Sequence, residues 1–136
     1  MRTSTTVVAA SFIIFECAAV QGTRISVTPH AEYSSSIGVL GCKIDTNRVT
    51  YWPSSVSCDN ICVRVSHVDS GRELNLLKID QSSGAYDVSY DAWNYLSFGK
   101  YATESPQQGG GVVMTYKEVH ASDCAHLINT ASKKLP

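Results

Sequence analysis

Residues 78–96 read KIDQSSGAYDVSYDAWNYL and combine a strand end, a turn and the start of a helix. The apolar run just before this stretch, at 76–79, is typical of a strand and ends at Asp80. Residues 81–84 are small or polar and include a glycine, which is typical of a turn. The sequence therefore places a carboxylate at the end of a predicted strand, beside a glycine-containing turn.

The second half of the stretch predicts one helix of about two to three turns. Its apolar residues follow one another at near-helical spacing, and Gly99 is suited to end it. Asp87 or Ser89 can cap its first turn. Trp93 lies within this helix, and at such spacing a tryptophan is more often a core residue than a platform for a sugar ring.

Short β-branched, aromatic or alternating runs surround this stretch. The expected strands are 37–40, 48–53, 60–68, 73–79 and 111–120, with 22–30 as a short edge strand or an extended arm. Many short strands with frequent turns predict a mainly-β fold, either a small closed barrel or a sandwich. Because the predicted helix lies inside the strand series and does not alternate with strands, a doubly wound α/β fold is disfavoured.

Composition indicates one compact domain and excludes two classes of partner. The chain has 136 residues, of which 43% are hydrophobic and 17% charged, and its formal net charge is -1. Positive and negative residues are mixed along the sequence, without the basic face typical of nucleic-acid-binding proteins. No basic amphipathic run indicates binding to a membrane surface.

The N-terminal segment is typical of a secretory signal peptide. Arg2 precedes an apolar run at 7–20, and cleavage is expected between Ala19 and Gly22. The alternative is a buried N-terminal strand or helix. The predicted organisation is a signal peptide at 1–21, a barrel domain at 22–128 and a tail at 129–136, with the mature protein secreted.

The cysteines support an extracellular protein with disulfide bonds. Cys17 would be removed with the signal peptide, which leaves Cys42, Cys58, Cys62 and Cys124. Four cysteines in a small secreted domain predict two disulfides, with three possible pairings. Zinc binding is the rival interpretation, but the further ligands available to Cys58 and Cys62 are widely scattered. No metal or other cofactor is expected.

Residues 57–93, SCDNICVRVSHVDSGRELNLLKIDQSSGAYDVSYDAW, and residues 110–124, GGVVMTYKEVHASDC, resemble the second half of a cerato-platanin. That family consists of small secreted fungal proteins with a double-psi β-barrel, and barwin and the first domain of expansins share its Asp-hydrophobic-Ser step. The resemblance implies a six-stranded, disulfide-stapled barrel with one or two short helices. It also implies that Cys42 pairs with Cys58, and Cys62 with Cys124.

The sequence departs from the family pattern in several places. Three residues separate Cys58 from Cys62 where the family usually has two, and the gap from Cys42 to Cys58 is shorter than usual. The loop at 105–111 is longer. The resemblance covers about half of the chain, roughly Ser57 to Cys124, and the sequence is described as cerato-platanin-like.

Asp80 is the leading candidate for contact with a polar ligand, because a carboxylate accepts hydrogen bonds from sugar hydroxyls. The candidate ligand-binding residues are Asp80, Gln81, Ser82, Gly84, Asp87, Tyr51 and Trp52. Each has a structural alternative: Asp80 and Asp87 can order their own turns, and the two aromatic residues can pack in the core. An exposed Tyr-Trp pair would suit stacking on a sugar or a protein partner.

The sequence contains no convincing catalytic constellation. Glycoside hydrolysis usually needs two carboxylates about 5–9.5 Å apart, and Asp87 and Asp91 have structural interpretations. A nucleophile-elbow motif and a phosphate-binding loop are both missing. The sequence therefore predicts a protein without catalytic residues, although a weak activity on glycans through Asp80 stays open.

The leading functional hypothesis is a secreted protein of cerato-platanin type that binds chitin or another cell-wall glycan and acts as a fungal elicitor or effector. The alternative is a secreted effector that inhibits a host extracellular enzyme, such as a cysteine protease, through loops near 50–57 and 104–111. A third possibility is a structural wall component. No nucleic acid or membrane partner is expected.

Overall fold

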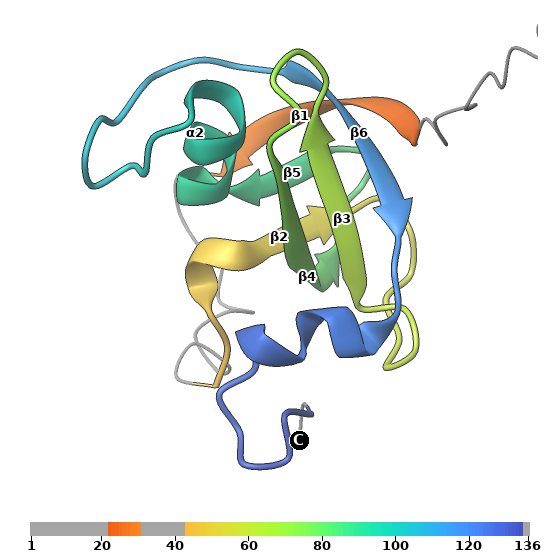
Figure 1. Ribbon diagram of the computed structural model, residues 1–136. Coiled ribbons are helices and arrows are strands. Elements are labelled where there is room, and N and C mark those ends of the chain that lie inside the picture. Colours follow the sequence, from red (N-terminus) through yellow and green to blue (C-terminus); the bar gives the residue numbers. More distant parts are fainter. Residues whose placement is uncertain (1–21, 31–42, 135–136) are drawn as a thin grey trace, which may run out of the picture.

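The computed structural model describes residues 22–30 and 43–134, which form one α-helix, two 3-10 helices and six strands (Figure 1). In chain order the elements are β1 (Thr23–His30), η1 (Thr46–Arg48), β2 (Val49–Trp52), β3 (Cys62–His67), β4 (Glu73–Gln81), β5 (Tyr86–Ser89), α2 (Tyr90–Phe98), β6 (Val112–Glu118) and η2 (Ala121–Leu127). The predicted signal peptide at 1–21 and the predicted strand at 37–40 lie outside these ranges.

The six strands close into a barrel in the order β1-β5-β2-β4-β3-β6. Two of the pairings, β1 with β5 and β2 with β4, are parallel, and the other four are antiparallel. The predicted small, mainly-β, six-stranded barrel with short helices is therefore confirmed. The mixed strand directions agree with the double-psi arrangement that the sequence resemblance implies.

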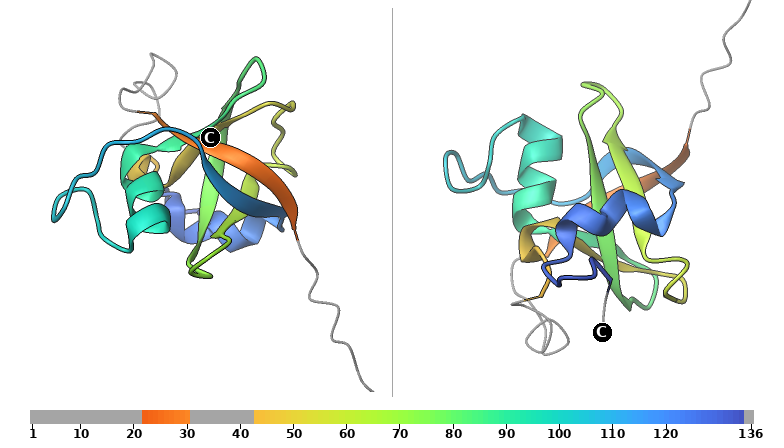
Figure 2. Two further views of the ribbon diagram at one scale, coloured as in Figure 1. Left: turned by 90° about the horizontal axis from the view of Figure 1, so that it is seen from above. Right: turned by 60° about the horizontal axis from the view of Figure 1, so that its bottom comes forward.

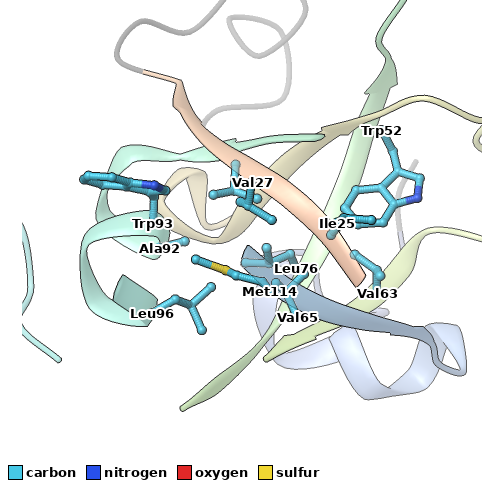
Figure 3. Packing of buried hydrophobic residues seen from close by; sticks show 11 residues of the cluster. Ile25, Val27, Trp52, Val63, Val65, Leu76, Ala92, Trp93, Leu96 and Met114 are labelled. Carbon is cyan, nitrogen blue, oxygen red and sulfur yellow. The ribbon is translucent and has the colours of Figure 1, made fainter. Parts of the chain in front are cut away.

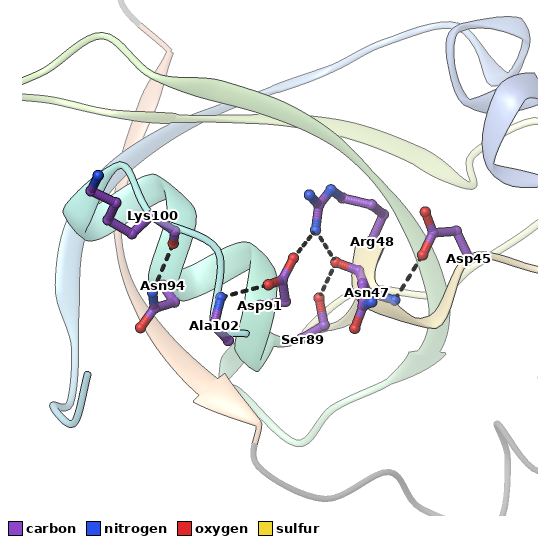
Figure 4. Close-up of polar contacts among 8 residues, drawn as sticks. All are labelled: Asp45, Asn47, Arg48, Ser89, Asp91, Asn94, Lys100 and Ala102. Carbon is purple, nitrogen blue, oxygen red and sulfur yellow. Dashed lines mark hydrogen bonds and ion pairs between the residues drawn. The ribbon is translucent and has the colours of Figure 1, made fainter. Parts of the chain in front are cut away.

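Strand β5 was not predicted from the sequence. Residues 86–89 were expected to lead into the helix, but they form a four-residue strand between β1 and β2. Ser89 does occupy the N-cap position of α2, yet its hydroxyl donates to the carbonyl of Asn47 at 2.7 Å and accepts no hydrogen bond from the first turn of the helix (Figure 4). The helix ends as predicted at Gly99, whose φ of 73° is easily adopted by glycine.

The barrel interior is filled from both ends by tryptophan side chains (Figure 3). Trp93 and Leu96 of α2 enter at one end and pack with Met114, while Trp52 lies towards the other end. Both indole rings are buried, and the Trp93 Nε1–H donates to the carbonyl of Gly110 at 3.2 Å. The interpretation of Trp93 as a core residue is confirmed.

A buried lysine completes the end of the barrel that holds Trp52. Lys78 is 1% exposed, and its ammonium donates to Asn60 Oδ1 at 2.7 Å and to Glu118 Oε2 at 2.6 Å. The same nitrogen lies 5.8 Å from the centre of the Trp52 ring, within the range of a cation–π contact. These partners compensate a charge that would otherwise be costly to bury.

The helix is fixed to the barrel through its C-terminal carbonyls. Arg72, in the turn between β3 and β4, donates from Nε to Tyr95 O and Leu96 O and from Nη2 to Ser97 O, all at 3.0–3.1 Å. A cation at the C-terminus of a helix also interacts favourably with the helix dipole.

Among the described residues, no helix has the length and apolarity needed to cross a membrane.

The loop after α2 is held by a buried asparagine. Asn94 is 0% exposed, and its amide nitrogen donates to Lys100 O at 2.7 Å and Ser105 O at 3.1 Å. Its amide oxygen accepts from the backbone N–H of Gln107 at 2.8 Å. One side chain thus satisfies three backbone groups of a loop that has no regular secondary structure of its own.

A second hydrophobic cluster lies outside the barrel, under η2. Figure 2 shows η2 crossing the strands when the bottom of the molecule is turned forward. Ile44, Leu77, Leu127 and Ile128 are buried there around the disulfide between Cys62 of β3 and Cys124 of η2. This pairing confirms one of the two disulfides that the resemblance implies.

Cys58 is exposed and forms no disulfide with another described residue. Its expected partner, Cys42, lies outside the described residues, so the second disulfide stays a prediction. Alkylation of the denatured, unreduced mature protein, followed by mass measurement, tests it: we expect no free thiol, and two labelled cysteines would refute the pair.

Replacing Trp93 by alanine should lower the free energy of unfolding by about 3–5 kcal/mol, because it empties the end of the core that α2 closes. Denaturant unfolding measures this loss. Trp93→Phe is the control, since it keeps an aromatic ring and loses the hydrogen bond to Gly110, and it should be less harmful. Unchanged melting of Trp93→Ala together with lost ligand binding would instead assign Trp93 to a binding site.

The double substitution Cys62→Ala and Cys124→Ala should lower the free energy of unfolding by about 4 kcal/mol. The disulfide joins positions separated by 62 residues, and a cross-link of this length strongly restricts the unfolded chain. The denaturation midpoint without reductant measures the effect. A midpoint equal to that of the unsubstituted protein would show that the disulfide contributes nothing to stability.

Candidate functional site

Four residues from four neighbouring strands form a row on the outer surface of the barrel. Thr28 of β1 pairs with Asp87 of β5, Asp87 pairs with Tyr51 of β2, and Tyr51 pairs with Asp80 of β4. Directly paired residues point to the same face of a sheet. We call Thr28, Asp87, Tyr51 and Asp80 the acidic row.

For Thr28, Asp87 and Tyr51 the outward direction follows from the alternation of side chains along each strand, whereas Asp80 follows a register shift in the pairing of β2 with β4. Val27, Trp52 and Val88, which each lie next to a member of the row in sequence, are buried in the barrel interior. Asp80 is exposed, and the other three members are partly exposed. The row therefore presents two carboxylates and a phenol ring on a rigid sheet surface.

Contacts within the row fix the orientation of its side chains. The Thr28 hydroxyl donates to the carboxylate of Asp87, and the His30 ring meets the Tyr51 ring edge-on, with centroids 4.9 Å apart. Asp80 Oδ1 accepts from the backbone N–H of Gln81 at 2.8 Å. Asp80 thus supports its own turn, as the structural alternative anticipated, while its side chain lies at the surface.

The turn after Asp80 forms the border of the row. Ser82 donates from its backbone N–H to Trp52 O at 2.8 Å, and its hydroxyl donates to Ala85 O. Gly84 has a φ of 141°, which residues with a side chain rarely adopt. Gln81, next to Asp80, is exposed. The predicted residues Asp80, Gln81, Ser82 and Gly84 are therefore contiguous on the surface.

Trp52 does not belong to this surface. It is 2% exposed and packs edge-on against Tyr86 and Tyr116, with ring centroids 4.8 and 5.0 Å away. Tyr51 and Trp52 point to opposite sides of the barrel wall because successive residues of a strand alternate. A ligand lying on the row would contact the ring of Tyr51 and would not reach that of Trp52.

Thr28 and His30 are the residues of this surface that sequence reasoning missed. The alternation at 22–30 indicated an extended segment, but it carried no information on which strand this segment would join. The parallel pairing of β1 with β5 places Thr28 beside Asp87. Pairing between segments so far apart in the chain leaves no local signal.

Asp91, the third carboxylate considered from the sequence, has a structural role (Figure 4). It forms an ion pair of 2.7 Å with Arg48 of η1 and accepts the backbone N–H of Ala102 at 2.8 Å. Both charged side chains of this ion pair are mostly buried. Asp91 therefore connects η1, α2 and the following loop, and it lies outside the acidic row.

The acidic row is separate from two hollows of the molecule. Two hollows of about 360 and 510 Å³ are present elsewhere among the described residues, and neither is lined by a member of the row. The resemblance also implied an open groove beside Asp80, and this stays a prediction. The described residues do not contain a group of three or more His, Cys, Asp or Glu side chains arranged to hold a metal ion.

Comparisons with known sequences find no match: no protein-family model and no curated protein corresponds to the chain. Solved structures do match. Cerato-platanin 3 of M. perniciosa aligns at a TM-score of 0.56 and 13% identity over 75% of this chain and 98% of its own. Cerato-platanin 2 of the same organism aligns at 0.54 and 17% identity over 75% and 98% of the two chains.

A third match is the solution structure of the fungal elicitor cerato-platanin, with a TM-score of 0.53 and 17% identity over 76% of this chain and 98% of that one. Each solved chain is thus covered almost entirely. Sequence identities this low establish similarity of fold alone. Together with the closed six-stranded mixed barrel and the Cys62–Cys124 disulfide, they show that this chain has the fold of a cerato-platanin.

Proposed function

We propose that this protein is a secreted, non-catalytic protein of cerato-platanin type that binds chitin oligomers or another cell-wall glycan on the acidic row. The observation that supports the proposal most directly is the alignment of Asp87, Tyr51 and Asp80 across three adjacent strands. A row of this kind offers hydrogen-bond acceptors to sugar hydroxyls on either side of an aromatic ring. Because the strands are already ordered, little conformational entropy is lost on binding.

The position of Tyr51 between the two carboxylates favours binding over hydrolysis. Asp87 and Asp80 lie on β5 and β4, with β2 between them, so their backbones are about 9.6 Å apart at the usual strand spacing. Tyr51 occupies the intervening position, where a hydrolase would hold the scissile bond and a water molecule. An exposed surface also lacks the exclusion of water that assists such chemistry.

The fold supports a biological role as an elicitor or effector. One structure that matches this chain is that of a fungal elicitor, and the sequence predicts a signal peptide and an extracellular location. We propose that glycan binding at the acidic row serves this role. Recovery of a host extracellular enzyme, such as a cysteine protease, in place of a glycan would favour the alternative function.

The test compares Asp80→Asn, Asp87→Asn and Tyr51→Ala with Asp69→Asn in pull-downs on insoluble chitin and cellulose and in calorimetric titrations with chitohexaose. Asp69 lies in the exposed turn between β3 and β4, away from the row, and undergoes the same chemical change. Loss of one charged acceptor should weaken binding about threefold to tenfold or more. Asp69→Asn should bind like the unsubstituted protein.

Melting temperatures separate a binding role for Asp80 from a structural one. Asparagine retains an oxygen that can accept the Gln81 N–H, so Asp80→Asn should melt close to the unsubstituted protein. If Asp80→Asn melts several degrees lower yet binds normally when folded, Asp80 only stabilises its turn. Equal retention of all three variants and the control would remove the acidic row as a glycan site.

A further inference from the structure

A second charged surface lies on β1, β6 and β3 and carries the opposite sign. Lys117 of β6 pairs with Arg64 of β3, and Arg24 of β1 pairs with Thr115, two residues before Lys117 on β6. Buried Ile25 and Val65 show that Arg24 and Arg64 lie on the outer face. We call Arg24, Arg64 and Lys117 the basic face.

The charges of the basic face lack acidic partners. Among the described residues, ion pairs form between Arg48 and Asp91 and between Lys78 and Glu118, and neither pair includes a residue of the basic face. Arg64 donates from Nε to the neutral amide oxygen of Asn75 at 2.9 Å. Lys117 and Arg64 are direct cross-strand neighbours of like charge, an arrangement that destabilises a sheet. A bound anion would relieve this repulsion.

A hollow of about 360 Å³ adjoins these cations. Arg24 and Lys117 line it, together with the hydroxyl-bearing residues Ser66, Thr115 and Tyr116. His67 and Glu73 also line the hollow. The Glu73 carboxylate accepts a hydrogen bond from the Ser66 hydroxyl at 3.3 Å. The hollow therefore combines two cations that form no ion pair with several hydroxyl groups and a single carboxylate, which keeps its negative charge.

We propose that the basic face and its hollow bind an acidic polysaccharide, a polymer whose sugars carry carboxylate groups. Carboxylates would pair with Arg24, Arg64 and Lys117, and sugar hydroxyls would bond to the hydroxyl groups of the hollow. Single-stranded nucleic acid fits less well, because binding there depends on stacking of bases on exposed aromatic rings. The ring of Tyr116, in the hollow, packs edge-on against buried Trp52.

Binding of polygalacturonate, measured by calorimetry at low ionic strength, tests this proposal. Each of Arg24→Gln, Arg64→Gln and Lys117→Gln should weaken binding about twofold to fivefold, and the triple variant at least about tenfold. The control Lys100→Gln removes one positive charge from an exposed residue after α2 and should leave affinity unchanged. Affinity should also fall as salt is raised, because these charges are exposed to solvent.

Two further ligands make the result specific. Fully methyl-esterified polygalacturonate has the same backbone without the charge, and it should not bind. An oligonucleotide of equal charge should bind more weakly than polygalacturonate. Equal affinity of the triple variant and the unsubstituted protein, equal binding of the esterified polymer, or tighter binding of the oligonucleotide would each overturn the proposal.

Folding and the acidic row are controlled separately. Lys117→Gln removes the repulsion with Arg64, so its melting temperature should be equal to or above that of the unsubstituted protein. A lower melting temperature would contradict the uncompensated charge on which the proposal rests. Asp80→Asn should keep full affinity for polygalacturonate, which distinguishes failure at the basic face from failure of the glycan site proposed on the acidic row.

Discussion

Closure of the barrel by β1 is the constraint on which the rest of the structure depends. This strand pairs in parallel with β5 on one side and antiparallel with β6 on the other. The same strand contributes Ile25 and Val27 to the core, Thr28 to the acidic row and Arg24 to the basic face. Because the strands close into a barrel, α2 and Trp52 can fill its two ends from opposite sides.

Barrel closure also separates the charges of a nearly neutral chain. Asp80 and Asp87 lie on the wall made by β5, β2 and β4, whereas Arg24, Arg64 and Lys117 lie on the wall made by β1, β6 and β3. Apart from Asp80, which follows a register shift between β2 and β4, these residues occupy outward-facing positions of their strands. Although the formal net charge is only -1, the protein therefore has two surfaces of opposite charge. We propose that these surfaces bind different classes of carbohydrate.

The helices and loops around the barrel are held by side chains that satisfy backbone groups and by the disulfide. Arg72 binds three carbonyls at the end of α2, and Asn94 binds three backbone groups of the following loop. The Cys62–Cys124 disulfide holds η2 against the outside of β3.

Local sequence determined the strands with clear alternation and the helix that ends at Gly99. It also determined the core role of Trp93 and the position of Asp80 at a strand end. Each of these features depends on residues that are neighbours in the chain. The resemblance to cerato-platanins supplied the barrel and the disulfide between Cys62 and Cys124. Only the tertiary structure revealed β5, removed Trp52 from the surface and brought Thr28 beside Asp87 and Arg64 beside Lys117. Strand register decides these contacts, and register is set by packing between segments distant in sequence.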